Sequence, residues 1–411
     1  MKSAQEQFKI IMKGVNQVVS DENLMGKLQK SIEANSPLVV KLGLDPSAPD
    51  IHLGHAVVLR KIKQMQDLGH RAVIIIGDFT GKIGDPSGKS KTRKPLTTEQ
   101  VLENAKTYEE QIFKILDRNK TDLKFNSQWL SKLNFEDVIK LAGKVTVARI
   151  LERDDFEKRY KNSEPIGLHE FFYPLMQAYD SVELKADIEM GGTDQTFNIL
   201  MGRTLQKDFG QESQVALFMP LLEGTDGIEK MSKSLGNYIG IYENAVTIYE
   251  KTMTIPDNLI IKYFELATDI HPDEVELIKL ELENPETNPR DVKMRLAKEI
   301  TTLYCGAKEA EIAEEHFKTV FQKNLIPEDI DEFTLSLDCF AQDGKIDLVK
   351  IISKSGITKS NGEARRLITQ NAVKIDGEKF NSFTISDTNS SFVIQVGKSK
   401  FIKVKAEEGS V

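Results

Sequence analysis

The sequence predicts an α/β protein built on a Rossmann-like, doubly wound parallel sheet, followed by a helical domain and a small α+β domain. The apolar runs 38–42 and 72–76 flank a segment whose apolar residues recur at helical spacing, the pattern of a buried strand, a helix and a parallel strand. Residues 256–323 are acidic with helical spacing, and residues 351–405 combine a short basic helix with small strands around an Asp-Gly turn. Ligands of such parallel sheets bind at the carboxyl ends of the strands.

The composition is that of a globular protein of two or three domains. The chain has 411 residues, of which 40% are hydrophobic and 29% are charged. Its two cysteines, Cys305 and Cys339, are too few for a disulfide framework or a cysteine zinc cluster. Residues 1–30 have the pattern of one polar amphipathic helix, and no stretch approaches the roughly 18 apolar residues of a membrane span. We therefore expect a cytoplasmic protein without a membrane partner.

Charge is distributed unevenly along the chain. The formal net charge is −8, but residues 345–411 hold 12 Lys and Arg against 7 Asp and Glu, a net +5 that leaves −13 on the other 344 residues. A basic module on an acidic body predicts that the C-terminal segment contacts a polyanion.

The first strand leads into a corner that contains two histidines. A proline-containing loop follows the strand, and the motif HLGH at 52–55 opens the next helix, which stops at Gly69. A helix N-terminus offers N–H groups and a favourable dipole to anions such as phosphate, and Gly54 lets a flat ring approach the backbone. Taken alone, this short pattern is more often structural than catalytic.

Two further loops carry lysines. Residues 229–235 read EKMSKSL and follow two glycines, which by itself is typical of a solvated lysine loop. Residues 84–90 follow the second strand and read GDPSGKS, one residue short of the GxxxxGKS phosphate loop, so a P-loop fails on spacing. The basic residues there, including Lys89 and Arg93, still favour a loop close to phosphates.

Polar residues at two other places are candidates for the walls of a pocket. Tyr173, Gln177 and Asp180 recur at i, i+4 and i+7 and share one face of an apolar helix, where they either complete a core network or line a pocket. The strand over 187–191 runs into a Gly-Gly turn and a helix that begins near Asp194. That aspartate is either an ordinary N-cap or a ligand of ribose hydroxyls.

Helical spacing continues between these landmarks. The clearest runs lie in the mostly helical region 99–160 and in the acidic region, at 99–116, 272–283, 288–305 and 307–321. Residues 324–344 are irregular, and we interpret them as a linker. The expected domains are a Rossmann-like domain with an N-terminal helix and an inserted helical segment at 1–238, a helical domain at 239–323 and a small α+β domain at 345–411.

HLGH followed one domain later by KMSKS is the signature pair of the class I aminoacyl-tRNA synthetases, and nearly the whole chain resembles the bacterial tyrosyl-tRNA synthetases. The resemblance includes GDPSGK at 84–89, QAYD at 177–180, GGTDQ at 191–195 and a tail similar to the S4 RNA-binding domain. Tryptophanyl enzymes share the fold but usually lack that tail. The resemblance implies that the chain activates L-tyrosine with ATP to tyrosyl-adenylate, releases pyrophosphate and transfers the tyrosyl group to the 3′ end of tRNA(Tyr), as a homodimer.

The family's functional residues carry over by position. Implied tyrosine ligands are Asp85, Tyr173 and Gln177 for the ammonium group, Asp180 for the phenol, Gln195 near the reacting carboxylate, and Lys41. Implied ATP ligands are Asp45, Ser47, His52, Gly54, His55, Gly192, Asp194, Lys230, Met231, Ser232, Lys233 and Ser234. The resemblance assigns catalysis to His52, His55, Lys230, Lys233, Lys89 and Arg93, and RNA binding to Lys359, Arg365, Arg366 and Lys374.

The implied mechanism needs no covalent enzyme intermediate, because the substrate's own carboxylate attacks the α-phosphate of ATP. Catalysis is then expected to consist of positioning and of stabilising the charge that develops on the phosphates. Mg²⁺ is expected to arrive with ATP as the substrate, with no metal or organic cofactor bound by the protein itself.

Three positions depart from the commoner pattern of the family. Lys41 stands where a second phenol-binding tyrosine is often found, and its ammonium group is expected near Asp180. Leu42 replaces a cysteine that contacts ribose and has no hydrogen-bonding side chain. In the tail, Asn371 replaces a frequent glycine, which is acceptable because asparagine also adopts left-handed backbone conformations.

Two other functions fit part of the pattern. HxGH also occurs in small-molecule adenylyltransferases, but those chains are usually far shorter and lack an S4 tail. An RNA-binding protein on a degenerate synthetase body would keep the tail without exchanging pyrophosphate into ATP. The intact residues of the two motifs argue against that alternative; they are His52, His55, Lys230 and Lys233.

Overall fold

The protein, seen in a computed structural model, is described over residues 2–45, 51–85, 97–322, 330–336, 339–340, 345–386, 391–397 and 400–405. Contacts within the chain divide it into two units, Met1–Ala307 and Lys308–Val411. Within the described residues, no helix combines the length and the apolar character that crossing a membrane requires.

A six-stranded sheet with the order β1-β6-β5-β2-β3-β4 organises the first unit. Its strands are β1 (Gln17–Val19), β2 (Val39–Leu44), β3 (Arg71–Ile76), β4 (Thr121–Phe125), β5 (Ile188–Gly192) and β6 (Val215–Met219). Every neighbouring pair is parallel except β1 and β6. The predicted α/β fold and three predicted strands are therefore confirmed. Because the chain leaves β2 and β5 in opposite directions, the carboxyl ends of these two strands flank the crevice in which doubly wound sheets bind ligands.

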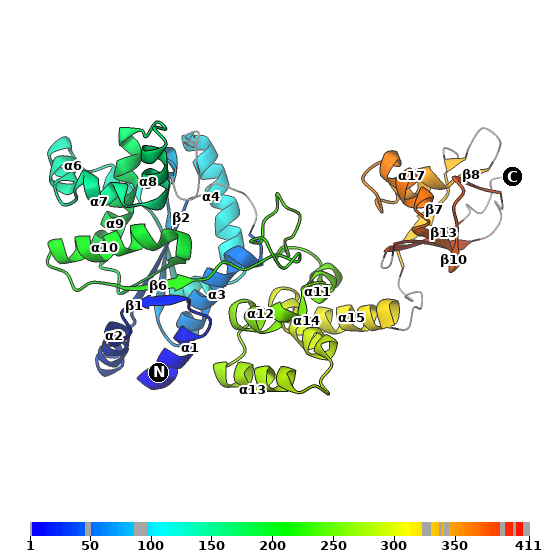
Figure 1. Ribbon diagram of the computed structural model, residues 1–411, viewed down its shortest axis with the longest axis horizontal. Coiled ribbons are helices and arrows are strands. Elements are labelled where there is room, and N and C mark those ends of the chain that lie inside the picture. Colours follow the sequence, from blue (N-terminus) through cyan, green and yellow to red (C-terminus); the bar gives the residue numbers. More distant parts are fainter. Residues whose placement is uncertain are drawn as a thin grey trace. The chain divides into compact units, whose positions relative to one another are not determined.

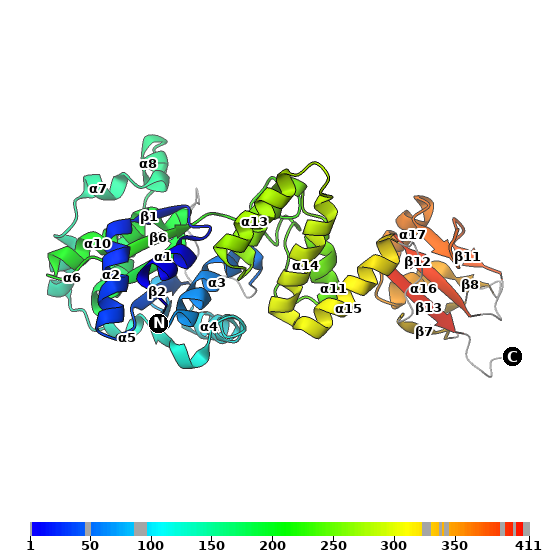
Figure 2. The same cartoon turned by 90° about the horizontal axis from the view of Figure 1, so that it is seen from below.

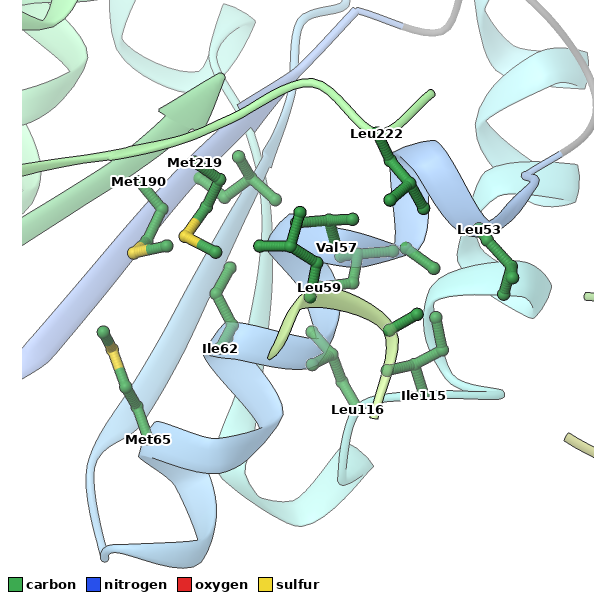
Figure 3. Packing of buried hydrophobic residues seen from close by; sticks show 14 of the residues in the cluster. Leu53, Val57, Leu59, Ile62, Met65, Ile115, Leu116, Met190, Met219 and Leu222 are labelled. Atoms are coloured by element: carbon green, nitrogen blue, oxygen red, sulfur yellow. The ribbon is translucent and has the colours of Figure 1, made fainter. Parts of the chain in front are cut away.

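Helices cover both faces of this sheet. On one face lie α3 (Leu53–Asp67) and α4 (Thr98–Ile112), and on the other lie α9 (Phe172–Leu184) and α10 (Thr196–Asp208) (Figure 1). Figure 3 shows Val57 and Ile62 of α3 in one buried cluster with Met190 of β5 and Met219 of β6. Burying side chains of this size stabilises the fold by roughly 1.5–3 kcal/mol each. The buried apolar face of α3 therefore holds this helix, and the histidine-containing segment at its start, against the sheet.

One expectation for the first unit is corrected. The single helix over 1–30 is wrong: this segment forms α1 (Ala4–Met12), β1 and α2 (Asp21–Glu33). Gly14 takes φ +66° just after α1, and the Ser20 hydroxyl caps α2. The mostly helical region 99–160 also contains β4 between α4 and four short helices, α5 (Ser127–Leu130), α6 (Phe135–Ala142), α7 (Val147–Leu151) and α8 (Asp154–Lys161). This strand has only five residues, one buried and four partly buried, which is too few to show a clear period.

Helices follow one another after the first sheet. They are α11 (Ala245–Met253), α12 (Ile260–Ala267), α13 (Pro272–Glu283), α14 (Pro289–Cys305) and α15 (Ala307–Phe317), of which α11 and α12 were not predicted individually. Proline at the first position starts both α13 and α14, and Gly306 at φ +92° ends α14. The three runs predicted from position 272 onward are confirmed.

The second unit starts within α15 and then contains a five-stranded sheet with the order β10-β9-β12-β13-β7, a two-stranded sheet and the helices α16 and α17 (Figure 2). Its elements are β7 (Glu332–Thr334), β8 (Ile346–Asp347), α16 (Leu348–Lys354), α17 (Asn361–Thr369), β9 (Val373–Ile375), β10 (Glu378–Lys379), β11 (Thr384–Ile385), β12 (Phe392–Val396) and β13 (Lys400–Lys405). The irregular linker expected over 324–344 is wrong at β7, which pairs with β13 in parallel. Asn371 takes φ +55°, as its left-handed tendency predicts.

Candidate active site

A cavity of about 320 Å³ lies at the carboxyl ends of β2, β3 and β5. It is the size of a small-molecule site and mixes apolar walls with convergent polar groups. The candidate residues that line it are Asp45, Gly54, His55, Asp85, Tyr173, Gln177, Asp180, Gly192, Asp194 and Gln195. The fold thus brings together side chains that lie up to 150 positions apart in the sequence.

Asp180, on the inner face of α9, provides a buried carboxylate in this cavity. Its side chain is 3% exposed and accepts hydrogen bonds from Trp129 Nε1 at 2.7 Å and from Asn126 Nδ2 at 3.4 Å. Burial raises the pKa of Asp180 to about 7, although the Lys41 ammonium and the two donors act in the opposite direction. A carboxylate that ionises near neutral pH in this setting is suited to accept a hydrogen bond from a neutral hydroxyl group.

Lys41, expected among the tyrosine ligands, does not line the cavity. Its side chain is completely buried, and its ammonium group lies 2.9 Å from Glu189 Oε1. It also donates to the backbone oxygen of Gln177 at 3.0 Å and to Ser181 Oγ at 2.7 Å. The parallel register places Lys41 opposite Glu189 on the neighbouring strand. The Lys41 ammonium group is therefore bound by protein groups, and it acts on Asp180 only through a Coulomb interaction.

A second polar network surrounds Asp85. This carboxylate accepts from Gln195 Nε2 at 2.9 Å and from Arg153 Nη2 at 3.2 Å. Asn198 Nδ2 donates to Gln177 Oε1 at 3.0 Å and to Gln195 Oε1 at 3.1 Å. Three candidate tyrosine ligands therefore belong to one hydrogen-bonded group, together with two residues that sequence reasoning missed.

Tyr173 and Asp45 form a third contact within the cavity. The Tyr173 hydroxyl donates to Asp45 Oδ2 at 2.8 Å, and Thr80 Oγ1 donates to Asp45 Oδ1 at 3.0 Å. Burial and the neighbouring carboxylates of Asp45 and Asp85 raise the pKa of Tyr173, so it remains a protonated donor. A Cβ atom at Gly77 would lie 2.0 Å from Asp45 Oδ1, so a side chain at this position would displace the Asp45 carboxylate.

The two histidines lie at the start of α3 with their rings stacked. The ring centroids are 3.9 Å apart at an interplanar angle of 21°. Burial lowers the pKa of His52 to about 3 and also lowers the pKa of His55, with Lys233 as a nearby positive charge in both cases. Both rings are therefore neutral at pH 7. His52 Nδ1 is buried and has no hydrogen-bond partner among the described residues, so this helix start has a polar atom available to a ligand.

The lysine loop packs on this histidine corner. The buried Met231 Sδ accepts from the Gly54 N–H at 3.3 Å, and Asn237 Oδ1 accepts from the Ser232 N–H at 2.8 Å. The hydroxyl oxygens of Ser232 and Ser234 are 2.9 Å apart. The side chains of Lys230 and Lys233 are exposed. Two motifs separated by most of a domain thus form one surface that combines neutral imidazoles with two cations.

The remaining candidates lie elsewhere. Ser47, Lys89 and Arg93 lie outside the described residues. In the second unit, Lys359, Arg365 and Arg366 are exposed and Lys374 is partly buried, on or next to α17 and β9. Among the side chains that the structure describes, no group of three or more His, Cys, Asp or Glu residues is arranged to hold a metal ion.

Comparisons with known proteins cover both units. A family model described as class I tRNA synthetases (W and Y) matches residues 33–322, and one described as the tyrosine–tRNA ligase SYY-like C-terminal domain matches residues 330–404. The chain is 61% identical over 407 residues to tyrosine–tRNA ligase 2 of Clostridium acetobutylicum, covering 99% of this chain and 100% of the relative. It is 50% identical over 406 residues to the tyrosine–tRNA ligase of Thermotoga maritima, covering 98% of each chain.

Solved structures show the same fold. A C-terminally truncated mitochondrial tyrosyl-tRNA synthetase of Aspergillus nidulans is similar with a TM-score of 0.64 at 21% identity, covering 78% of this chain and 97% of that one. The tyrosyl-tRNA synthetase of Archaeoglobus fulgidus complexed with L-tyrosine is similar with a TM-score of 0.60 at 23% identity, covering 76% of this chain and 99% of that one.

Proposed function

The chain belongs to the class I tRNA synthetases of the tryptophan and tyrosine group, and on that premise we propose that it is a tyrosine–tRNA ligase. It activates L-tyrosine with ATP and transfers the tyrosyl group to tRNA(Tyr). The observation that carries the choice of tyrosine is the Asp180 carboxylate, which is buried in a small cavity and held by Trp129 and Asn126. The substrate's phenol hydroxyl donates to this carboxylate, and phenylalanine, which has the same ring without the hydroxyl, offers no such donor.

The other end of the amino acid is assigned to the Asp85 network. The ammonium group of tyrosine meets Asp85, Gln177 and Tyr173, whose side chains line the same cavity. Gln195 orients the carboxylate that will react, and its amide is already fixed by Asp85 and Asn198. Holding both ends of the substrate places its carboxylate for attack on the α-phosphorus of ATP, so positioning supplies a large part of the rate.

ATP is assigned to the corner where the two motifs meet. Asp45, Gly54, Gly192 and Asp194 bind the nucleoside, with Asp194 accepting from the ribose hydroxyls. The neutral His52 and His55 donate hydrogen bonds to the phosphates at the N-terminus of α3. The loop of residues 230–234, with the exposed side chains of Lys230, Lys233 and Ser234, approaches the pyrophosphate. The two lysines stabilise the charge that grows on the pyrophosphate in the transition state. Ser47, Lys89 and Arg93 are assigned to the same phosphates, and Mg²⁺ arrives with ATP.

Transfer of the tyrosyl group to tRNA requires an RNA contact away from the cavity. The basic segment 345–411 of the second unit supplies the contact for tRNA.

The protein is further proposed to act as a homodimer in the cytoplasm. Support for the dimer comes from large apolar side chains exposed between α6 and α9, which are unusual on a monomer. These are Phe135, Ile139, Val147, Tyr160 and Leu168, exposed by 80%, 56%, 62%, 67% and 73%.

Pyrophosphate exchange into ATP with each of the twenty amino acids tests this function. Exchange is expected with tyrosine, far above the rate with phenylalanine or tryptophan. A small-molecule adenylyltransferase would instead exchange only when its own acceptor substrate is supplied and with no amino acid, and a degenerate synthetase would not exchange at all. Either of those results would overturn the assignment.

Neutralising the basic surface of the second unit should separate the two half-reactions. With Lys359, Arg365, Arg366 and Lys374 replaced by alanine, the affinity for tRNA is expected to fall at least about tenfold at physiological salt. The slope of the logarithm of the tRNA affinity against the logarithm of the salt concentration should become less steep by about one unit for each phosphate that the variant no longer neutralises. Tyrosine-dependent pyrophosphate exchange should be unchanged in the same protein. Charging of tRNA at the full rate would show that the RNA is anchored elsewhere.

A further inference from the structure

We propose that Arg153, which precedes α8 in the inserted helical segment, is a positioning residue for the amino-acid site. Its guanidinium holds the Asp85 carboxylate and the adjoining amides in the orientation that receives the substrate's ammonium group. This inference rests on the proposed function, and it adds a residue that neither the sequence motifs nor the cavity walls identify.

The geometry of Arg153 supports this role. Its side chain is 4% exposed, and each guanidinium nitrogen contacts a different partner. Nη2 donates to Asp85 Oδ1 at 3.2 Å, Nη1 to Asn198 Oδ1 at 3.2 Å, and Nε to Asp155 Oδ1 at 2.7 Å. The guanidinium also lies 5.1 Å from the centre of the Phe156 ring, which limits its movement. A planar group fixed at three nitrogens can transmit a defined orientation to its partners.

Arg153 reaches the substrate ligands only through its partners. It does not line the cavity, whereas Asp85, Gln177 and Gln195 do. Asn198, whose side-chain oxygen accepts from Arg153, donates from its nitrogen to the side chains of both Gln177 and Gln195. One buried guanidinium therefore fixes the carboxylate directly and the two glutamine amides through one asparagine.

The charges lead to the same conclusion. Arg153 lies between the carboxylates of Asp85 and Asp155, so this group of three carries one net negative charge before the substrate binds. The substrate's ammonium neutralises that charge. Without the guanidinium, two partly desolvated carboxylates would repel each other, and Asp85 would move or take up a proton and lose its alignment.

The test compares tyrosine with 3-(4-hydroxyphenyl)propionate, which is tyrosine without its amino group. In full-length Arg153→Met, the KM for tyrosine in pyrophosphate exchange is expected to rise by about 10- to 100-fold, the range for losing one charge-assisted hydrogen bond. The KM for ATP and the inhibition constant of the propionate should each stay within about twofold. This difference separates an effect on the ammonium site from a general distortion of the cavity.

Arg159→Met is the matched control. Arg159 also lies in the inserted segment, on α8, is 3% exposed, and is paired with Glu170 at 2.6 Å rather than with the amino-acid site. Its replacement should lower the unfolding temperature and leave the KM for tyrosine unchanged. Arg153→Lys provides a second, milder variant, because it keeps the charge without the planar fork, and it should raise the KM for tyrosine by a smaller factor.

Two results would overturn the inference. One is an unchanged or lower KM for tyrosine in both Arg153 variants, and the other is an equal rise in the KM for tyrosine and in the inhibition constant of the propionate. If Asp85→Asn left the KM for tyrosine unaltered, the ammonium would be bound elsewhere, and the inference would fail with that assignment. Absence of tyrosine-dependent exchange in the unaltered protein would instead refute the proposed function itself.

Discussion

Lys233→Ala is expected to lower the rate of tyrosyl-adenylate formation by about 10²- to 10³-fold and to leave the Kd for tyrosine within about twofold. The lysine lies on the exposed loop that packs against the histidine corner, and its charge is felt by both imidazoles. Because burial keeps those imidazoles neutral, we assign the positive charge needed by the leaving pyrophosphate to Lys230, Lys233 and the other cations proposed for the phosphates. That charge matters most in the transition state, so its loss should appear in the rate rather than in tyrosine binding.

Stopped-flow or quenched-flow measurement of adenylate formation at saturating tyrosine would check this prediction. Lys251→Ala is the control, since Lys251 lies 4.4 Å from the centre of the same Tyr238 ring that Lys233 approaches at 5.6 Å. Lys251 is paired with Glu243, and its replacement should change the rate only a few-fold. A comparable loss in tyrosine affinity for Lys233→Ala would contradict its assignment to the phosphates.

The parts of the site that were predictable from sequence are those carried by short motifs. HLGH begins a helix as its spacing predicts, and helical spacing places Tyr173, Gln177 and Asp180 on one face, which the structure turns toward the cavity. Local periodicity determines both features, so the sequence suffices for them.

The missed residues depend on an element that has no clear period. Asn126 directly follows β4, and Trp129 lies in the short helix after it. Because the carboxyl ends of parallel strands meet at one edge of a sheet, recognising β4 would have placed both residues beside Asp180. The surroundings of Lys41 were likewise inaccessible, since its pairing with Glu189 follows from the register between two strands that are far apart in the sequence. Arg153 was missed because no local pattern links the inserted segment to Asp85.

Asp180→Asn is expected to lower kcat/KM for tyrosine by at least about 10- to 100-fold, and to lower it far more than kcat/KM for phenylalanine. The ionised carboxylate accepts a hydrogen bond from the phenol, whereas phenylalanine leaves this buried charge without that partner. Lys41→Ala should change the ratio of the two substrates less, because the Lys41 ammonium is bound to Glu189 rather than to the substrate. It should instead destabilise the fold by about 3–5 kcal/mol, because it leaves a buried carboxylate unpaired.

The pKa of Asp180 predicts how the preference for tyrosine over phenylalanine changes with pH. Burial raises the pKa of Asp180 to about 7, so the carboxyl group is largely neutral at pH 6 and ionised at pH 8 in the unbound protein. Ionisation favours the phenol and penalises phenylalanine, and the ratio of kcat/KM for tyrosine over phenylalanine should therefore rise between these values. The pKa of His52 is lowered to about 3, so this imidazole titrates below this range, and burial lowers the pKa of His55 as well. In Asp180→Asn the ratio should be small and independent of pH.

Thermal unfolding separates this effect from simple damage to the fold. A carboxyl group whose pKa is raised from 3.8 to about 7 by folding stabilises the native state below about pH 4, and this contribution is lost as the pH rises through 7. At pH 8 the unbound protein holds an ionised buried Asp180, whereas the asparagine variant does not. Asp180→Asn should therefore unfold at no lower temperature than the unaltered protein at pH 8, while its specificity collapses. Pyrophosphate exchange with tyrosine and with phenylalanine tests this role of Asp180. If the ratio of the two kcat/KM values were unchanged in Asp180→Asn, the phenol would be recognised elsewhere.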